Sequence, residues 1–226
     1  ANMWNSPEKG DWKTGAVGIG SSEACMLGGV AAWLRWRERR KAEGKPYDKP
    51  NLVMSTAYQV VWEKFCQLWQ IEMRTVPITR KHTTLDVEKA ISMCDENTIC
   101  IVPIAGVTWT GMNDDIEGLN NALEEYNRKT GYDIPIHVDA ASGGFILPFL
   151  DPDKRWDFRL KWVLSISTSG HKYGLVYPGL GWVIWRDKTY LPKDMSFSVN
   201  YLGANITQVG LNFSRPAAQV LGQYYQ

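Results

Sequence analysis

The sequence predicts an α/β domain with a mainly parallel sheet covered by helices on both faces. Short strand patterns alternate with helical patterns along most of the 226 residues, and several strand patterns are apolar throughout. The polar residues best suited to chemistry come just after such strands, where ligands gather in folds of this kind. Neither an internal repeat nor a low-complexity linker interrupts the pattern, so one domain is expected over residues 1–226.

The first long element is a helix that opens in the Gly/Ser-rich segment 18–23 and runs to about Lys41. Its apolar residues recur three and four positions apart, as on one helix face: Ala24, Leu27, Ala31 and Leu34. A basic run follows at its end: Arg35, Arg37, Arg39, Arg40 and Lys41. We interpret this run as a solvated face that stabilises the helix C-terminus, with phosphate binding as the alternative. No convincing strand precedes this helix.

Strands and helices then alternate. Strand patterns occupy residues 51–55, 71–78, 98–105, 134–139, 163–167 and 181–186. Helical patterns occupy residues 59–69, 85–94 and 115–129. Six of the eleven tryptophans fall inside these patterns and are assigned to the core or to a subunit interface rather than to ligand stacking: Trp33, Trp36, Trp62, Trp69, Trp182 and Trp185.

Composition excludes several classes of function. The formal net charge is +1, so no global field favours nucleic acid or an anionic membrane. The apolar runs are shorter than a membrane span and no signal region opens the chain, so a cytoplasmic protein is expected. No metal site is expected, because the cysteines and histidines lack ligand spacing. Buried, reduced thiols are expected at Cys25, Cys66, Cys94 and Cys100.

Both ends of the sequence look cut. No initiator methionine is present, and residues 219–226 stop inside an apparent helix without a capping signal. We therefore expect the sequence to be part of a longer protein.

Lys172 is the first candidate for chemistry. It follows a run of small polar residues, 165–170, and precedes Tyr173-Gly174, a setting that suits a tight, enclosed turn. Burial there lowers the pKa of a lysine and frees its amine to form a Schiff base with an aldehyde cofactor. An ordinary surface lysine is the alternative.

Asp139 is the second candidate. It closes an apolar strand and precedes the small residues 140–144, which leave room for a flat ring. A carboxylate against a pyridine nitrogen keeps that nitrogen protonated, as pyridoxal 5'-phosphate (PLP) requires. A simple turn cap is the alternative for Asp139 alone.

Gly20-Ser21-Ser22-Glu23 opens the first helix and offers exposed N–H groups and hydroxyls to a phosphate. Taken alone this signal is weak, because serine and glycine commonly cap helices. Gly18-x-Gly20 is not a dinucleotide fingerprint, since the third glycine is missing.

Together these segments resemble a known family. The longest of them are residues 20–24, 137–145, 156–160, 167–174, 181–186 and 212–215. They are similar to the PLP-dependent glutamate decarboxylases of bacteria and plants, within the group II amino acid decarboxylases, and the similarity covers nearly the whole chain. The resemblance implies the large PLP-binding domain of the aspartate-aminotransferase-like class (fold type I), with the preceding segment and the C-terminal small domain outside residues 1–226.

The resemblance also implies roles for individual residues. Lys172 would carry the cofactor, and Asp139 would pair with its ring nitrogen. Positions matching phosphate-binding residues are Ser21, Ser22, Ser169 and His171. Thr108 matches a residue near the phenolic oxygen, Ala141 one that packs on the ring, and Ser214 one that reaches the phosphate of the neighbouring subunit. A homodimer or higher homo-oligomer with shared active sites is therefore implied.

Gln59 helps to choose among the related decarboxylases of this superfamily. Related decarboxylases of aromatic amino acids and histidine usually stack a histidine on the cofactor face, whereas Gln59 resembles the glutamine of the glutamate enzymes. Two departures stand out. Ile104 replaces a small hydroxyl residue found in some members, and segment 54–57 differs from the expected sequence.

The resemblance implies decarboxylation of L-glutamate to 4-aminobutanoate and CO₂, with consumption of one proton. Two alternatives stay open. Another PLP-dependent amino acid decarboxylase or carbon–carbon lyase would share the Lys–Asp pair. A catalytically silent homologue would serve as a binding or scaffold subunit, although it would have little reason to keep the whole site.

Overall fold

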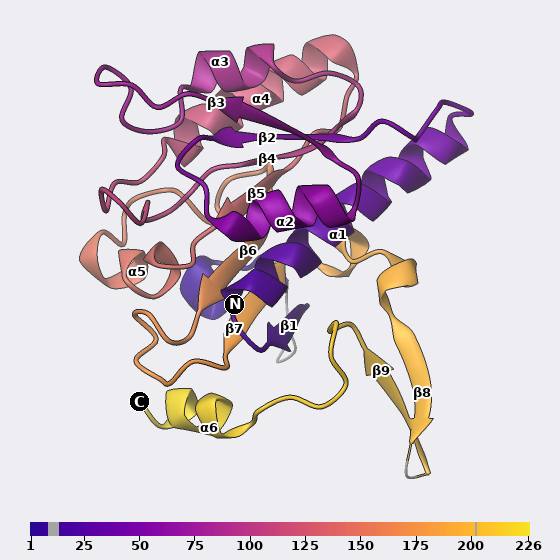
Figure 1. The fold of residues 1–226 in the computed structure, drawn as a ribbon, viewed down its shortest axis with the longest axis vertical. Coiled ribbons are helices and arrows are strands. Elements are labelled where there is room, and N and C mark those ends of the chain that lie inside the picture. Colours follow the sequence, from indigo (N-terminus) through magenta and orange to yellow (C-terminus); the bar gives the residue numbers. More distant parts are fainter. Residues whose placement is uncertain (9–13, 202) are drawn as a thin grey trace.

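The computed structural model describes residues 1–8, 14–201 and 203–226, and a seven-stranded sheet forms its centre (Figure 1). In chain order the strands are β1 Gly15–Gly18, β2 Asn51–Ser55, β3 Glu72–Val76, β4 Thr98–Val102, β5 Ile136–Asp139, β6 Val163–Ser169 and β7 Gly181–Trp185. Their spatial order is β1-β7-β6-β5-β4-β2-β3. β7 runs opposite to the other six strands of this sheet, so the expected mainly parallel sheet is confirmed.

The helices lie between the strands in sequence and cover both faces of the sheet. They are α1 Ser21–Ala42, α2 Val60–Leu68, α3 Val87–Ser92, α4 Ile116–Thr130, α5 Leu147–Leu150 and α6 Ala218–Tyr225. Short 3₁₀ turns occupy Asn2–Trp4, Gly143–Phe145, Lys188–Tyr190 and Lys193–Met195. A separate antiparallel hairpin is formed by β8 Phe197–Tyr201 and β9 Ala204–Gln208.

Alternate residues of each central strand supply two cores. On β2, Leu52 and Met54 pack with α1 and α2, whereas Val53 packs in the cluster that contains α3 and α4. All five residues of β2 are buried, as expected for a strand with helices on both sides. Figure 1 shows α1 and α2 on one face and α3 and α4 on the other.

Local chemistry sets the ends of the elements. The helix predicted from residue 85 begins at Val87 because Asp86 caps it, accepting a hydrogen bond from the Lys89 N–H. The strand predicted over 98–105 ends at Val102, since Pro103 has no N–H for the ladder. Gly131, at φ 75°, ends α4 in the left-handed conformation that glycine adopts readily.

The prediction that no strand precedes the first helix is wrong. β1 pairs with β7 directly before α1, and it escapes the strand pattern because two of its four residues are glycine. The neighbouring strand approaches Gly15 closely, since a Cβ there would lie 2.9 Å from the Val183 carbonyl oxygen and 2.6 Å from Ile184 Cδ1. The β8–β9 hairpin was likewise not predicted.

The basic end of α1 is only partly a solvated face. Arg35 and Arg39 both pair with Asp133, at 2.9 and 3.6 Å, next to the helix C-terminus. Arg40 is buried, and its Nε donates to the Pro46 carbonyl at 2.8 Å. These contacts engage three of the five basic residues of the run and hold the helix end in place.

The four cysteines are buried and free, as predicted. In the part of the chain that the structure describes, no helix combines the length and apolarity needed to cross a membrane.

Candidate active site

The candidate catalytic residues lie at the carboxyl edge of the sheet. Asp139 ends β5 and pairs in register with Ser167 of the parallel neighbour β6. β6 continues to Ser169, and Lys172 follows in the loop that leads to β7. Because β5 and β6 are adjacent and parallel, both residues lie at the same carboxyl edge of the sheet.

The carboxylate of Asp139 is held on both oxygens. The residue is 3% exposed; its Oδ2 accepts the Trp62 indole N–H at 2.8 Å, and its Oδ1 accepts the Ala141 backbone N–H at 3.1 Å. Both donors are neutral, so they orient the carboxylate without neutralising its charge. The carboxylate therefore has a fixed orientation at the end of β5.

The amine of Lys172 lies close to the residues that follow Asp139. Its Nζ donates to Ser142 Oγ at 3.4 Å, and its side chain is half-buried. A cavity of about 550 Å³ is bounded by Thr108, Ser142 and Lys172 among other residues. The site thus offers an accessible amine beside a cavity large enough for a small cofactor and substrate.

The thiol of Cys25 is buried beneath the end of β6, where it contacts Ser167 Oγ at 3.2 Å. Burial, followed by the charge of Asp139, raises the pKa of Cys25 well above its ordinary value. The hydrogen bond with Ser167 and the charge of Lys172 act in the opposite direction.

The N-terminus of α1 and the end of β6 meet across one glycine. Gly181 pairs with Ser169 on β6 and with Gly18 on β1, and a Cβ on it would collide with the Gly20 carbonyl. Ser21 follows Gly20 as the first residue of α1. Close packing at Gly181 thereby brings the N–H groups of α1 and Ser169 to the same corner of the sheet.

Ser169 has an unused hydroxyl at this corner. The residue is fully buried, and its Oγ has no hydrogen-bond partner in the structure. Gly20 has open space where a side chain would stand, and no side chain caps α1. A buried orphan hydroxyl beside a helix N-terminus fits an anionic group such as a phosphate.

Gln59 and Thr108 form a second pair at the edge. Gln59 precedes α2, and its Nε2 donates to Thr108 Oγ1 at 2.8 Å. Ala141 is half-buried between Asp139 and Ser142. The predicted residues for the cofactor ring thus come from the ends of β5, the start of α2 and the loop after β4.

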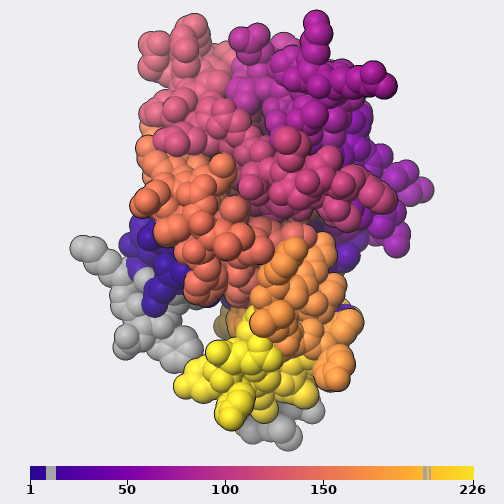
Figure 2. Space-filling view, turned by 90° about the vertical axis from the view of Figure 1, so that its left-hand side faces the viewer, coloured from indigo at the N-terminus to yellow at the C-terminus, as the bar shows by residue number. Residues whose placement is uncertain are grey.

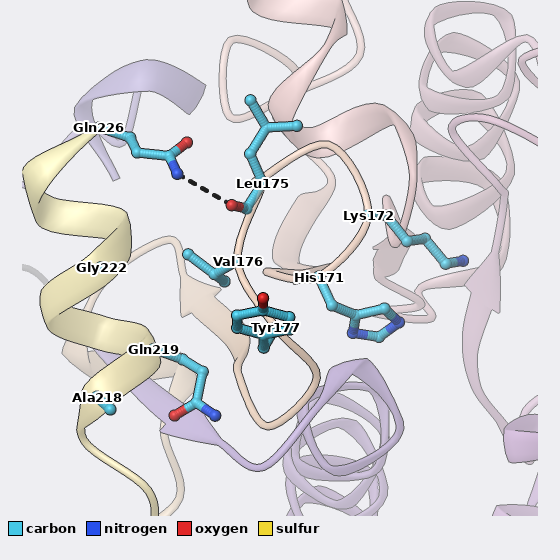
Figure 3. A pocket seen from close by; sticks show the side chains of 9 residues that line it. All are labelled: His171, Lys172, Leu175, Val176, Tyr177, Ala218, Gln219, Gly222 and Gln226. Atoms are coloured by element: carbon cyan, nitrogen blue, oxygen red, sulfur yellow. Dashed lines mark hydrogen bonds between the residues drawn. The ribbon is translucent and has the colours of Figure 1, made fainter.

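Two predicted residues lie apart from this group. His171 is exposed and lines a second cavity, of about 570 Å³, which Lys172 also borders and which lies between the lysine loop and α6 (Figure 3). Ser214 is exposed in the segment after β9. The backbone N–H of Leu211 in that segment donates to Glu23 Oε1 at 2.9 Å, and Arg215 donates to the Val17 carbonyl at 2.7 Å. The segment is therefore fastened beside the start of α1.

A hydrogen-bonded layer supports the site from below. The ring nitrogens of His137 contact Ser165 Oγ at 2.7 Å and Ser167 Oγ at 3.0 Å, and Ser167 also contacts the Cys25 thiol at 3.2 Å. Burial lowers the pKa of His137 to about 3, so its ring is neutral. The imidazole ring of His137 packs edge-to-face with the indole ring of Trp62, and their centroids lie 5.3 Å apart.

Sequence reasoning missed two contributors. Trp62 was assigned to the core, and it is fully buried, but its indole N–H also holds Asp139. A signal was present: Trp62 lies in the first turn of α2, three positions after the candidate residue Gln59 that precedes this helix. Glu23 was noted only as part of the helix start, whereas its carboxylate accepts the Ile19 N–H at 2.7 Å and fastens the segment at Leu211.

The residues present fit PLP. An amine at Lys172 and a carboxylate at Asp139 stand at one sheet edge, and the unpartnered hydroxyl of Ser169 lies near the start of α1. The fold and the site together define a class: an α/β protein whose sheet edge offers an amine, a carboxylate and a helix N-terminus, the groups that suit an aldehyde cofactor with a phosphate.

Comparison with known proteins agrees with this class. Residues 1–226 match the pyridoxal-dependent decarboxylase conserved domain, and the chain belongs to that family. The chain is 55% identical to the glutamate decarboxylase of Lactococcus lactis subsp. cremoris, covering 100% of this chain and 48% of that protein. It is 51% identical to glutamate decarboxylase 1 of Arabidopsis thaliana, covering 45% of that protein. The chain thus spans about half the length of these relatives.

The fold is confirmed by solved structures. The Lactobacillus brevis glutamate decarboxylase superposes with a TM-score of 0.93 at 52% identity, covering 99% of this chain and 51% of that chain. The sphingosine-1-phosphate lyase of Burkholderia pseudomallei gives a TM-score of 0.79 at 23% identity, with 99% and 50% covered. The expected fold type I architecture is therefore present.

Proposed function

We propose that the full-length protein is a PLP-dependent glutamate decarboxylase that converts L-glutamate and one proton to 4-aminobutanoate and CO₂. The observation that carries this proposal is that the Lys172 amine, which donates to Ser142, and the doubly held Asp139 carboxylate lie at the same edge of the sheet. Identity of 50–55% to bacterial glutamate decarboxylases supports the choice of substrate.

Lys172 and Asp139 have distinct tasks in this proposal. When bound, PLP accepts the electron pair that remains when the α-carboxylate leaves as CO₂. Lys172 would hold the cofactor through its amine. Asp139, oriented by Trp62 and Ala141, would keep a proton on the ring nitrogen and so maintain the ring as an electron acceptor.

The remaining predicted residues would orient the cofactor. Ser21 and Ser22 at the start of α1, together with Ser169 and His171, would hold the phosphate. Gln59 would lie against the ring and keep Thr108 aimed at the phenolic oxygen through their 2.8 Å hydrogen bond. Ala141 is small enough to let the ring lie close to the backbone.

We further propose that residues 1–226 form the large cofactor-binding domain of a cytoplasmic homodimer or higher homo-oligomer. Large apolar side chains near the site support an assembly, since Trp109 is 79% and Tyr177 is 85% exposed. Ser214 would then reach the phosphate in the neighbouring subunit, and its exposure leaves it free to do so.

CO₂ release by the full-length protein with PLP tests the proposal. Glutamate, aspartate and aromatic amino acids are compared at equal concentration, with Lys172→Ala as the inactive control. Preference for glutamate is expected. Release from an aromatic substrate but not from glutamate would identify another decarboxylase, and absence of bound cofactor would identify a silent homologue.

A further inference from the structure

A row of glutamines on α6 faces the loop that carries Lys172. Gln219, Gln223 and Gln226 are four and three positions apart, which places them on one side of the helix and its C-terminal end. Figure 2 shows the C-terminal segment in yellow packed against the orange surface beside it, and Figure 3 shows α6 along the loop.

Each glutamine amide donates to a backbone carbonyl of this loop. The Nε2 of Gln219 donates to the Pro178 carbonyl at 3.1 Å, and that of Gln226 donates to the Leu175 carbonyl at 3.0 Å. Gln223 donates to the Gly174 carbonyl at 3.2 Å. The loop thus receives three of its hydrogen bonds from side chains of one helix.

Gln223 also binds the sheet. Its Oε1 accepts the Trp182 indole N–H at 2.6 Å, and Trp182 belongs to β7. One half-buried side chain therefore connects a fixed strand to the carbonyl of Gly174, two residues after Lys172. A Cβ on Gly174 would collide with the Gln223 amide, so the two are closely packed.

The loop depends on such support. Leu175 has φ 58°, a left-handed conformation that is unfavourable for a leucine. A 2.9 Å hydrogen bond from the Gly170 N–H to the Leu180 carbonyl closes the base of the loop, but its hydrogen bonds around Lys172 are long. The N atoms of Leu175 and Val176 each lie 3.4 Å from the carbonyl oxygens of Lys172 and Gly170, respectively. In Figure 3 the Lys172 side chain points away from α6, so the helix contacts the side of the loop opposite to the amine.

We propose that Gln223 is a positioning residue for Lys172, and that docking of α6 fixes the loop so that the amine points to Ser142 and the end of β5. The effect on cofactor attachment at Lys172 rests on the proposed function. The holding of the loop by α6 does not. Gln219 and Gln226 assist by holding the carbonyls of Pro178 and Leu175.

The experiment compares Gln223→Met with Gln67→Met in the full-length protein. Gln67 is an exposed glutamine on α2, away from the lysine loop, and serves as the matched control. Amide hydrogen exchange of residues 170–178 reports the loop, and exchange of residues 116–130 in α4 reports general stability. Covalent trapping of PLP on Lys172 by borohydride reduction, followed in time by mass spectrometry, reports the position of the amine.

We expect Gln223→Met to raise exchange at 170–178 about fivefold or more, while α4 is unchanged. Trapping at Lys172 should slow by a similar factor, and Gln67→Met should match the wild type in both measurements. If Gln223→Met does not fold, Gln223→Glu replaces it, because glutamate keeps the acceptor for Trp182 but cannot donate to Gly174.

Unchanged exchange at 170–178 would overturn the proposal, since α6 would then not hold the loop. Faster exchange with unchanged trapping would also overturn it, because the amine would not depend on the loop contact. If the wild type traps no PLP on Lys172, the proposed function fails instead, and the exchange result alone decides whether α6 holds the loop.

Discussion

The indole N–H of Trp62 donates to Oδ2 of Asp139 at 2.8 Å, so a tryptophan of α2 fixes a carboxylate at the end of β5. Both side chains are buried, which strengthens the bond between a neutral donor and a charged acceptor. The same tryptophan packs on the neutral ring of His137, two residues before Asp139. Trp62 therefore connects the core to the candidate catalytic carboxylate.

Trp62→Phe removes this donor while keeping most of the ring volume. Loss of a hydrogen bond to a buried charged group costs about 1.5–3 kcal/mol, so we expect PLP to bind about tenfold or more weakly. Equilibrium dialysis of the full-length protein measures the dissociation constant of PLP. Trp69→Phe, just after the same helix, is the control and should bind as the wild type does. Equal affinity in the two variants would show that the indole N–H has no part in holding the cofactor.

Asp139→Asn keeps the shape of the side chain but removes its charge. We expect weak retention of the cofactor and a large loss of decarboxylation rate, because the ring nitrogen no longer meets a negative partner. Cofactor content and steady-state rates measure both effects. Normal kinetics in this variant would remove Asp139 from the mechanism.

Gly28→Ala tests how closely α1 packs on the site. Gly28 faces His137 so closely that a Cβ would collide with the imidazole ring. We expect destabilisation of about 1–3 kcal/mol in urea unfolding, despite the better helix propensity of alanine. Gly222→Ala on α6 is the matched control, since its Cβ would meet only Val176 at 3.6 Å. Comparable stability of the two variants would contradict the close contact.

His137 makes folding sensitive to acid. Its pKa is about 3 in the folded protein against an ordinary value of 6.5, so below 6.5 the unfolded chain binds a proton that the folded chain does not. The contribution of His137 is therefore fully present above pH 6.5 and is lost as the pH falls toward 3, by up to about 1.4 kcal/mol per pH unit.

NMR of the imidazole ring provides the direct test. The His137 signals should remain those of a neutral ring at about pH 5, where an ordinary histidine is mostly protonated. His137→Gln should reduce the slope of stability against pH over the same interval. Titration of the ring near its ordinary pKa would contradict the buried, neutral assignment.

Much of the fold was predictable because its signals are local. The apolar pattern at 98–102 and the helix face of Leu119 and Leu123 depend on residues close in sequence, and the structure has these elements. The shared edge for Asp139 and Lys172 followed from a general rule about parallel sheets. These predictions needed no knowledge of distant contacts.

The rest depends on contacts between distant residues. β1 has a weak strand pattern and is stabilised by pairing with β7, more than 160 residues later. The bond from Trp62 to Asp139 spans 77 positions, and that from Leu211 to Glu23 spans 188. Periodicity identifies such residues as buried or polar, but it does not indicate which partner each one meets.

The most direct test of the central claim is to treat the full-length protein with PLP and borohydride and to map the labelled lysine, alongside CO₂ release from glutamate by Lys172→Ala. We predict the label on Lys172 and no measurable release by the variant. A label on a different lysine, or even modest decarboxylation by Lys172→Ala, would contradict the account.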